Sequence, residues 1–198
     1  SPGIQSGRIY AEVSTLVKTG IAIANPNNRA ATLSFFFSNS NGNFGNGVMT
    51  IPANGQITKF LSEPPFNAPS SLTGTFTFSS SAPVAVTALR GGTNERDEFL
   101  MTTLPVADVS APVMTSTVVF PHFADGGGWT TQIILVNPTD SVLAGTAQFL
   151  DPSGRPATLT VNNQSNTSFA YSIPARSSQK LSTLGAAPAV QSGSVRVV

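Results

Sequence analysis

The apolar residues of this chain fall in short runs that alternate with polar residues, and helical periodicity is nearly absent. The runs are rich in Val, Ile, Phe and Thr, and Gly, Pro and Asn separate them, as in strands joined by turns. In Thr73–Ser79, for example, Phe76 and Phe78 share one face of the predicted strand, and Thr75 and Thr77 share the other. Such alternation is typical of an antiparallel sheet with one face in water.

The same pattern predicts about fifteen short strands, and therefore an all-β protein built from antiparallel β-sandwiches. In the first half of the chain the predicted strands are Arg8–Ser14, Gly20–Asn25, Ala31–Ser38, Val48–Ile51, Gln56–Phe60, Thr73–Ser79, Val84–Arg90 and Phe99–Pro105. In the second half they are Thr117–Phe123, Thr130–Asn137, Gly145–Leu150, Ala157–Val161, Thr167–Ile173, Gln179–Leu184 and Gly193–Val198.

An imperfect internal repeat divides these strands into two sets. The segment TGIAIANPNNRAATLSFFF (Thr19–Phe37) matches TQIILVNPTDSVLAGTAQFL (Thr131–Leu150), and both place Asn-Pro after an alternating strand. IPANGQITKFL (Ile51–Leu61) then matches IPARSSQKLSTL (Ile173–Leu184), and LTGTFTFS (Leu72–Ser79) matches QSGSVRVV (Gln191–Val198). Three matches in the same order predict two Ig-like antiparallel β-sandwich domains in tandem, residues 1–109 and 110–198.

The two repeats differ at their C-terminal ends. The first continues past Ser79 through two further predicted strands, whereas the second reaches only Val198, the position that matches Ser79. We therefore expect the second domain to lack its last strands and to present a groove with unpaired strand edges. The chain begins Ser1-Pro2-Gly3 without Met, which predicts a processed product.

The register of the alternating runs also predicts which side chains form the two cores. Those of the first domain are Phe35, Phe37, Phe76, Phe78, Val84, Val86 and Leu89, and those of the second are Ile133, Leu135, Phe149, Phe169 and Val195.

Composition excludes several classes of function. The net charge of +1 from 10 basic and 9 acidic residues argues against nucleic-acid binding, which needs a basic surface. The absence of Cys and the single His exclude thiol chemistry and a multi-His metal centre. No apolar run approaches the roughly 18–20 residues of a membrane span, so we expect no membrane insertion. We expect neither a cofactor nor catalysis, because His122 is the sole candidate base and no G-x-S-x-G motif surrounds a serine.

Two segments concentrate the remaining polar chemistry. In FPHFADGGGWTTQ (Phe120–Gln132), a sugar could stack on Trp129 while His122 and Asp125 bind its hydroxyls; alternatively the three glycines form a turn and Trp129 packs on the domain edge. The sequence favours the turn, since a single aromatic ring is a small platform. Asn94–Glu98 lacks the spacing of a calcium loop and predicts a hairpin loop in water.

The strings TGIAIANP, PVAVTALR, TTLP and FADGGGWTTQIILVNPT resemble tandem repeats of large uncharacterised bacterial surface proteins, which are multidomain chains of Ig-like or fibronectin-like β-sandwiches. The resemblance covers most of the 198 residues. It implies an extracellular structural role and supplies no catalytic residues. Fragments of such chains also resemble subunits of extracellular Ig-like filaments.

These observations predict a structural subunit of an extracellular bacterial filament or surface fibre, whose partners are copies of the same chain. We expect the N-terminal segment of one copy to fill the groove of the next, because donated strands complete open sheets. The predicted donor residues are Ile4, Ile9, Tyr10 and Val13, and the predicted acceptor residues are Val195, Val197 and Val198. A head-to-tail contact of this kind propagates into an open filament.

Two alternatives stay open at this point. One is an adhesin-type module that recognises a glycan or a protein at a cell surface through His122, Asp125 and Trp129. The other is that the second domain is frayed or closed by its own strands.

Overall fold

The computed structural model describes residues 3–94, 96–112 and 116–198, and these residues form strands, turns and loops without a helix. No helix that could cross a membrane is therefore present in the described ranges. The strands pair in antiparallel fashion in both halves of the chain. The prediction of an all-β, antiparallel fold is confirmed.

The chain divides into two compact units that do not coincide fully with the predicted domains. Unit 1 consists of Ser1–Pro112 together with Val136–Ser141 and Pro174–Ser178. Unit 2 consists of Val113–Leu135, Val142–Ile173 and Gln179–Val198. Two short segments from the second half of the sequence thus pack with the first unit.

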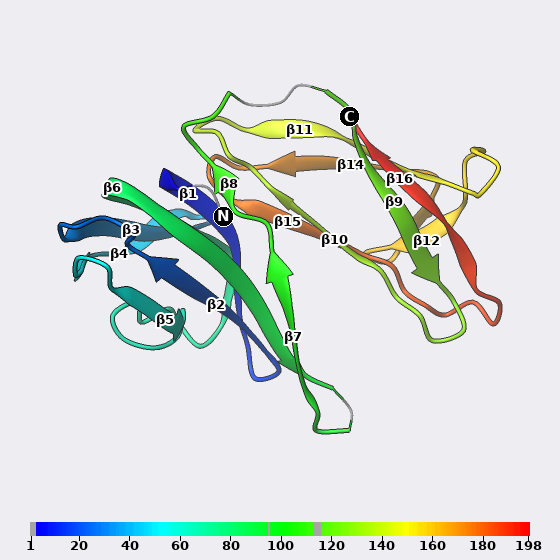
Figure 1. Cartoon of the computed structure of the whole chain (residues 1–198). Helices are drawn as coiled ribbons and strands as arrows, with labels where there is room; N and C mark the ends of the chain where they lie inside the picture. The colour runs from blue at the N-terminus through cyan, green and yellow to red at the C-terminus, as the bar shows by residue number, and fades with distance from the viewer. Residues whose placement is uncertain (1–2, 95, 113–115) are drawn as a thin grey trace. The chain divides into compact units, whose positions relative to one another are not determined.

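Unit 1 is a curled sheet of eight strands (Figure 1). Its strands are β1 (Ile4–Val13), β2 (Val17–Ala24), β3 (Ala31–Asn39), β4 (Gly42–Ile51), β5 (Gln56–Phe60), β6 (Leu72–Thr93), β7 (Phe99–Leu104) and β8 (Ala107–Asp108). The strand order is β4-β3-β6-β1-β2-β5, with β7 on β6 and β8 on β1.

The 22-residue strand β6 belongs to two rows of strands, which is why the sheet curls. Its first half lies between β3 and β1, and Phe76 pairs with Phe37 on one side and with Ile9 on the other. Its second half lies between β2 and β7, and Ala88 pairs with Ile21 and Leu104. One row is therefore β4-β3-β6-β1, and the other is β5-β2-β6-β7.

The core of unit 1 is rich in phenylalanine. The Phe76 ring is fully buried and lies 5.2–5.6 Å, centroid to centroid, from the rings of Phe35, Phe37 and Phe66. The predicted core residues of this half are buried except Leu89. Since Val84, Val86 and Ala88 alternate toward the core, Leu89 falls on the opposite face of β6.

Unit 2 contains a four-stranded sheet of order β14-β11-β16-β9, a two-stranded sheet of β10 and β15, and the hairpin β12-β13. The strands are β9 (Val118–Asp125), β10 (Gln132–Val136), β11 (Leu143–Leu150), β12 (Leu159–Val161), β13 (Gln164–Asn166), β14 (Ser168–Ile173), β15 (Ser178–Ser182) and β16 (Gln191–Val197). The predicted core residues Ile133, Phe149, Phe169 and Val195 are buried, and Leu135 is half-buried against them.

Matching contacts show that the sequence repeat is also a structural repeat. The Thr19 hydroxyl accepts a hydrogen bond from the Glu12 amide at 2.9 Å, and the Thr131 hydroxyl accepts one from the Ala124 amide at 3.0 Å. A Cβ atom at Gly74 would collide with the backbone carbonyl of Ser38, and one at Gly193 with that of Leu150. Strand β1 thus corresponds to β9, β2 to β10, β3 to β11, β5 to β15, and the first half of β6 to β16.

The two Asn-Pro motifs form the same buried corner. The side-chain amide of Asn25 donates to the carbonyls of Arg29 and Ile51, and that of Asn137 donates to the carbonyls of Ser141 and Pro174. Both side chains are fully buried. Asn is required at these corners because its amide pairs with backbone carbonyls that would otherwise be buried without a donor.

Candidate functional site

The predicted donor strand is an internal strand of unit 1. Strand β1 pairs with β6 from Ile4 to Val13, and its other edge contacts β8 at Gly7 and Arg8 and β2 at Val13. Ile9, Tyr10 and Val13 are buried, and Ile4 packs against the core. The prediction of a free N-terminal donor is corrected accordingly, because β1 already fills its own sheet; Ser1 and Pro2 lie outside the described residues.

The predicted acceptor residues lie on a strand that has partners along both edges. Strand β16 pairs with β11 through Val195 and Val197, and with β9 on its other side. Val195 and Val197 are buried, while Val198 is exposed but exchanges backbone hydrogen bonds of 2.9 and 3.0 Å with Thr146. Strand β16 therefore cannot be the open edge that the sequence predicted.

The open edge of unit 2 is the far edge of β10. In unit 1, β2 pairs with β5 on one side and with the second half of β6 on the other, from Val17–Gly92 to Ala24–Ala85. Its counterpart β10 pairs with β15, and no second strand pairs with it among the described residues. Leu135 is only half-buried, whereas Ile23 at the matching position of β2 is fully buried. We call this edge of β10 the open edge.

The three residues of the predicted ligand loop do not converge on one site. His122 is exposed in an open depression with Asp151 and Ser194. Asp125 is buried and lines a different depression, where its carboxylate accepts a hydrogen bond of 2.7 Å from the Gly185 amide. Trp129 lines neither depression and is 64% exposed.

The glycines of this loop form the turn that the sequence predicted. Gly126, Gly127 and Gly128 all have positive φ angles, and Gly126 and Trp129 exchange two backbone hydrogen bonds of 3.0 Å. Trp129, which closes this turn by pairing with Gly126, is largely exposed and not packed into the core. An exposed indole can stack on a ligand without help from His122 or Asp125.

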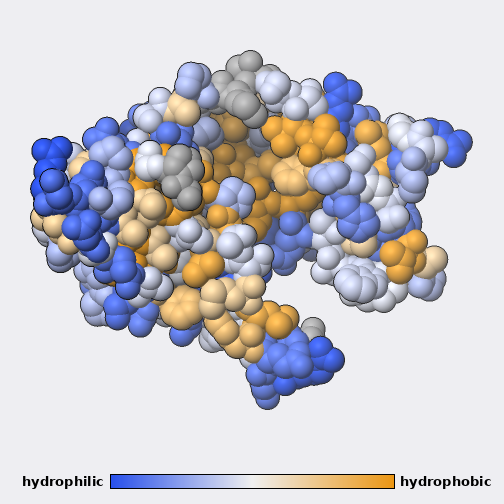
Figure 2. Space-filling view, in the orientation of Figure 1, coloured by the Kyte–Doolittle hydropathy of each residue, from blue (hydrophilic) through white to orange (hydrophobic). Residues whose placement is uncertain are grey.

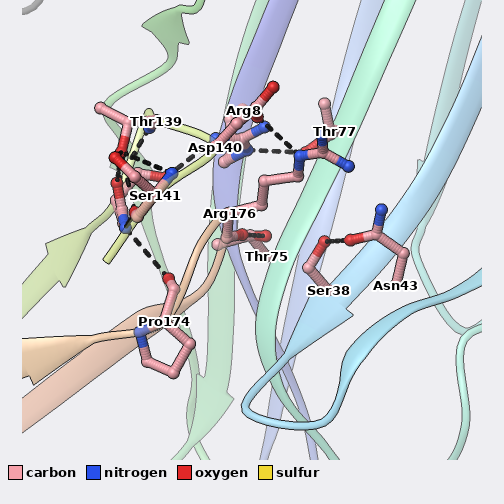
Figure 3. A network of polar contacts seen from close by, with 11 residues as sticks. Arg8, Ser38, Asn43, Thr75, Thr77, Thr139, Asp140, Ser141, Pro174 and Arg176 are labelled. Carbon is pink, nitrogen blue, oxygen red and sulfur yellow. Dashed lines mark hydrogen bonds and ion pairs between the residues drawn. The ribbon is translucent and has the colours of Figure 1, made fainter. Parts of the chain in front are cut away.

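A buried polar network in unit 1 was not predicted (Figure 3). Arg8 of β1 is 3% exposed; its Nε donates to the Thr77 hydroxyl at 2.8 Å and its Nη1 to the Asn137 carbonyl at 2.9 Å. The Thr75 hydroxyl donates to the Arg176 carbonyl, and the Ser178 hydroxyl to the Gly74 carbonyl at 2.9 Å. The outer faces of β1 and β6 are thus covered by residues 136–141 and 174–178, and the solvated face predicted for Thr75 and Thr77 is wrong.

An ion pair between Asp140 and Arg176 shifts the pKa values of both side chains at the rim of this network. Arg176 Nε donates to Asp140 Oδ1 at 2.6 Å, and this hydrogen bond lowers the pKa of Asp140 and raises that of Arg176. Burial lowers the pKa of Arg8, and the Asp140 carboxylate partly offsets that effect. The guanidinium stays charged, because the ordinary pKa of arginine lies far above neutral pH.

The network holds chain segments together, because Arg8 and the hydroxyls of Thr75 and Ser178 donate to backbone carbonyls of segments distant in the sequence. Among the residues that the structure describes, no three His, Cys, Asp or Glu side chains gather where they could hold a metal ion. The Tyr10 hydroxyl is buried and makes no hydrogen bond of ordinary geometry within the described residues. Burial, and after it the nearby Glu12 carboxylate, raise the pKa of Tyr10.

A signal for the network was present in the sequence. In Arg8–Val13, Ile9, Ala11 and Val13 alternate with Arg8, Tyr10 and Glu12, so one face is apolar and the other holds long polar side chains. That pattern is the same for a face in water and for a face covered by hydrogen-bonding loops. Only the packing of residues 136–141 and 174–178 distinguishes the two cases.

Comparisons with known proteins do not place the chain in a family. No family model and no curated protein matches the sequence. Among solved structures, Thermotoga maritima 1070 has a TM-score of 0.45 and 11% identity over 54% of this chain and 97% of its own. The Anabaena sensory rhodopsin transducer has a TM-score of 0.40 and 15% identity over 43% of this chain and 95% of its own. Both likenesses are too weak to carry an argument about function.

Proposed function

We propose that this chain is a structural subunit of an extracellular bacterial filament or surface fibre, built from two Ig-like sandwiches of which the second is incomplete. Copies join head-to-tail when a strand of one copy is added to the open edge of the next. The protein is a structural element and not an enzyme, and it needs no cofactor. The resemblance to tandem repeats of bacterial surface proteins and the low charge, 10% of residues, support this role.

The observation that carries the proposal is the open edge of β10. Five strands of the second repeat follow those of the first in the same order, yet among the described residues no strand pairs with β10 as the second half of β6 pairs with β2. An unpaired edge presents a row of backbone donors and acceptors and recruits another strand. Adding a strand there also covers apolar side chains such as Leu135, which is half-buried in unit 2.

The experiment compares two lysine substitutions at matching positions of the repeat. Ile134→Lys places a charge on the open edge, whereas Ala22→Lys places one at the corresponding position of β2, which has partners on both sides. Electron microscopy and sedimentation of the parent chain should show fibres. Ile134→Lys should raise the concentration needed for assembly by at least roughly tenfold, and Ala22→Lys should not. A parent chain that stays monomeric at high concentration contradicts the proposal.

The second candidate is an adhesin-type module, and one observation favours it. Trp129 is 64% exposed where it closes the glycine turn, and an exposed indole can stack on a sugar. Trp129 is the sole tryptophan, so its fluorescence reports on this loop alone. Titration with a glycan panel should shift the emission if the loop binds sugars, and an unchanged spectrum across the panel argues against this function.

A further inference from the structure

We propose that the strand added to the open edge of β10 is β7 of a second copy. This inference rests on the proposed function and names its contact. The two strands meet edge to edge, so that the row β15-β10 of one copy continues into the row β7-β6-β2-β5 of the next.

Strand β7 has the properties of an unprotected edge. It pairs with β6 along one side, from Ala88–Leu104 to Thr93–Phe99, and no other described strand pairs with it. Its residues Phe99, Leu100 and Met101 are 54%, 58% and 53% exposed. Figure 2 shows these apolar residues as orange and pale-orange atoms over β7, beside the blue hairpin loop. Three large exposed apolar residues in sequence on an edge strand predict that something covers them.

The open edge of β10 matches β7 in length, charge and face. Strand β10 has five residues and β7 has six, and neither contains a charged residue. In β10, Ile133 and Leu135 face the core, and Ile134 and Val136 lie on the outer face. In β7, Leu104 packs against its own core, which places Met101 and Thr103 on the outer face. A continuous sheet therefore joins outer face to outer face.

Several other edges in the described residues carry features that discourage pairing. On the uncharged edge strand β14, the Ser172 amide already donates a hydrogen bond of 3.3 Å to Gln179 Oε1. Strands β5 and β15 each contain a lysine, Lys59 and Lys180, and β9 contains Pro121, which has no amide hydrogen to donate. Strand β4 contains three glycines, which favour neither pairing nor a fixed register. We therefore assign the contact to β7 and β10.

A contact between two different edges is heterologous. A row of joined copies has a free β7 edge at one end and a free β10 edge at the other. Assembly therefore continues unless the rotation between copies closes a ring. This geometry has a specific consequence for blocked variants. A copy with a charged β7 can still accept, and a copy with a charged β10 can still donate.

The first test uses that consequence. Met101→Lys blocks β7, and Ile134→Lys blocks the open edge of β10. Each variant alone should remain monomeric by sedimentation, while an equimolar mixture should form a one-to-one dimer and no fibres. Formation of the dimer also shows that both variants are folded. If the mixture stays monomeric while the parent chain forms fibres, β7 is not the added strand.

The second test is disulfide trapping, which the chain permits because it contains no cysteine. Ile134→Cys is mixed with Met101→Cys, with Thr103→Cys, or with the control Thr58→Cys on the exposed edge of β5. Strand neighbours bring Cα atoms within the roughly 4.4–6.8 Å that a disulfide needs. At least one β7 variant should cross-link to Ile134→Cys roughly tenfold more than the Thr58→Cys control.

The outcomes separate this inference from the proposed function. Fibres that form without cross-linking above the control overturn the assignment of β7 and leave the proposed function standing. A parent chain that forms no fibres at any concentration overturns the proposed function itself. Cross-linking through β7 together with fibres supports both.

Discussion

At the scale of single residues, hydrogen-bonding partners decide where polar side chains of this chain are placed. Arg8 is buried because it donates hydrogen bonds to the Asn137 carbonyl and to the Thr77 hydroxyl, which is buried with it. Thr75 is buried because its hydroxyl donates to the Arg176 carbonyl. Asn25 and Asn137 are buried because each closes the same Asn-Pro corner. A buried donor that loses its acceptor costs more than the hydrogen bond contributes, so these positions are sensitive to substitution.

We expect Arg8→Met to lower the free energy of unfolding by about 1.5–3 kcal/mol. Methionine keeps the apolar stem but leaves the Asn137 carbonyl and the Thr77 hydroxyl without their donor. Urea unfolding followed by circular dichroism measures the change. Arg196→Met is the control, since Arg196 is exposed on β16 and its loss should change stability by less than about 0.5 kcal/mol. Equal effects of the two substitutions would contradict a structural role for Arg8.

The Asp140–Arg176 ion pair should make stability depend on pH in one direction. Its hydrogen bond lowers the pKa of Asp140 from the ordinary 3.8, so the carboxylate stabilises the fold above that value, and the contribution disappears as the pH falls through the lower folded pKa. At pH 7 the Asp140→Asn variant should therefore unfold at a lower urea concentration than the parent chain. At the acidic end of a pH series the two chains should unfold at the same urea concentration. In an Arg176→Gln background, Asp140→Asn should have a smaller effect, because only the longer-range interaction of Asp140 with Arg8 remains.

At the scale of elements, the position of a strand in the sheet matters more than its composition. The apolar face of β1 predicts a strand that could be donated to another copy. In the structure, however, β1 pairs with β6 and belongs to the core of unit 1. The terminal position and the valines of β16 in the sequence predict a strand with an unpaired edge. In the structure, β16 pairs with β11 on one side and with β9 on the other. The less conspicuous β10 is left with the open edge, because the second half of β6 has no counterpart among the described residues of unit 2.

Deletion of residues 1–13 should unfold unit 1 and not merely prevent assembly. The deletion removes Ile9 and Val13 from the core, each worth roughly 1.5–3 kcal/mol of burial, and exposes β6 along its first half. Against a typical total of about 5–15 kcal/mol, that loss is large. Two-dimensional NMR of the truncated chain should lack the dispersed resonances of unit 1. A truncated chain that remains folded and forms the same fibres would contradict the place of β1 in this sheet.

At the scale of the whole molecule, the chain carries two uncharged apolar edges and almost no net charge. The net charge is +1, and neither β7 nor β10 contains a charged residue. Assembly through such edges depends on backbone pairing and apolar burial. Both contributions are nearly independent of salt, unlike contacts between surface charges.

We therefore expect the concentration needed for assembly to change by less than about twofold between roughly 0.05 and 0.5 M NaCl, where charge screening changes several-fold. Urea below the unfolding range should raise it, because urea solvates apolar and peptide groups. Sedimentation at a series of protein concentrations measures both effects. A steep dependence on salt would indicate that charged groups, and not the edges of β7 and β10, join the copies.

The amino-acid sequence by itself determined the repeat and most of the strands and core residues, although the predicted strands Thr73–Ser79 and Val84–Arg90 are one continuous strand, β6. Phe76, Phe78 and Phe149 are buried as their alternation predicts, because the side-chain period of a strand is a local property of the backbone. It also determined that the second half of the chain repeats the strands of the first, because the three matches occur in the same order.

The tertiary structure alone decided which strand has that edge and which polar faces are covered. Strand β10 and its counterpart β2 occupy matching positions of the sequence repeat, but a second strand, distant in sequence, pairs with β2, and none in the described residues pairs with β10. The sequence likewise predicts that the polar face of β1 and β6 lies in water, whereas in the structure residues 136–141 and 174–178 pack on it. Pairing and covering are contacts between residues far apart in the chain, and local periodicity contains no information about them.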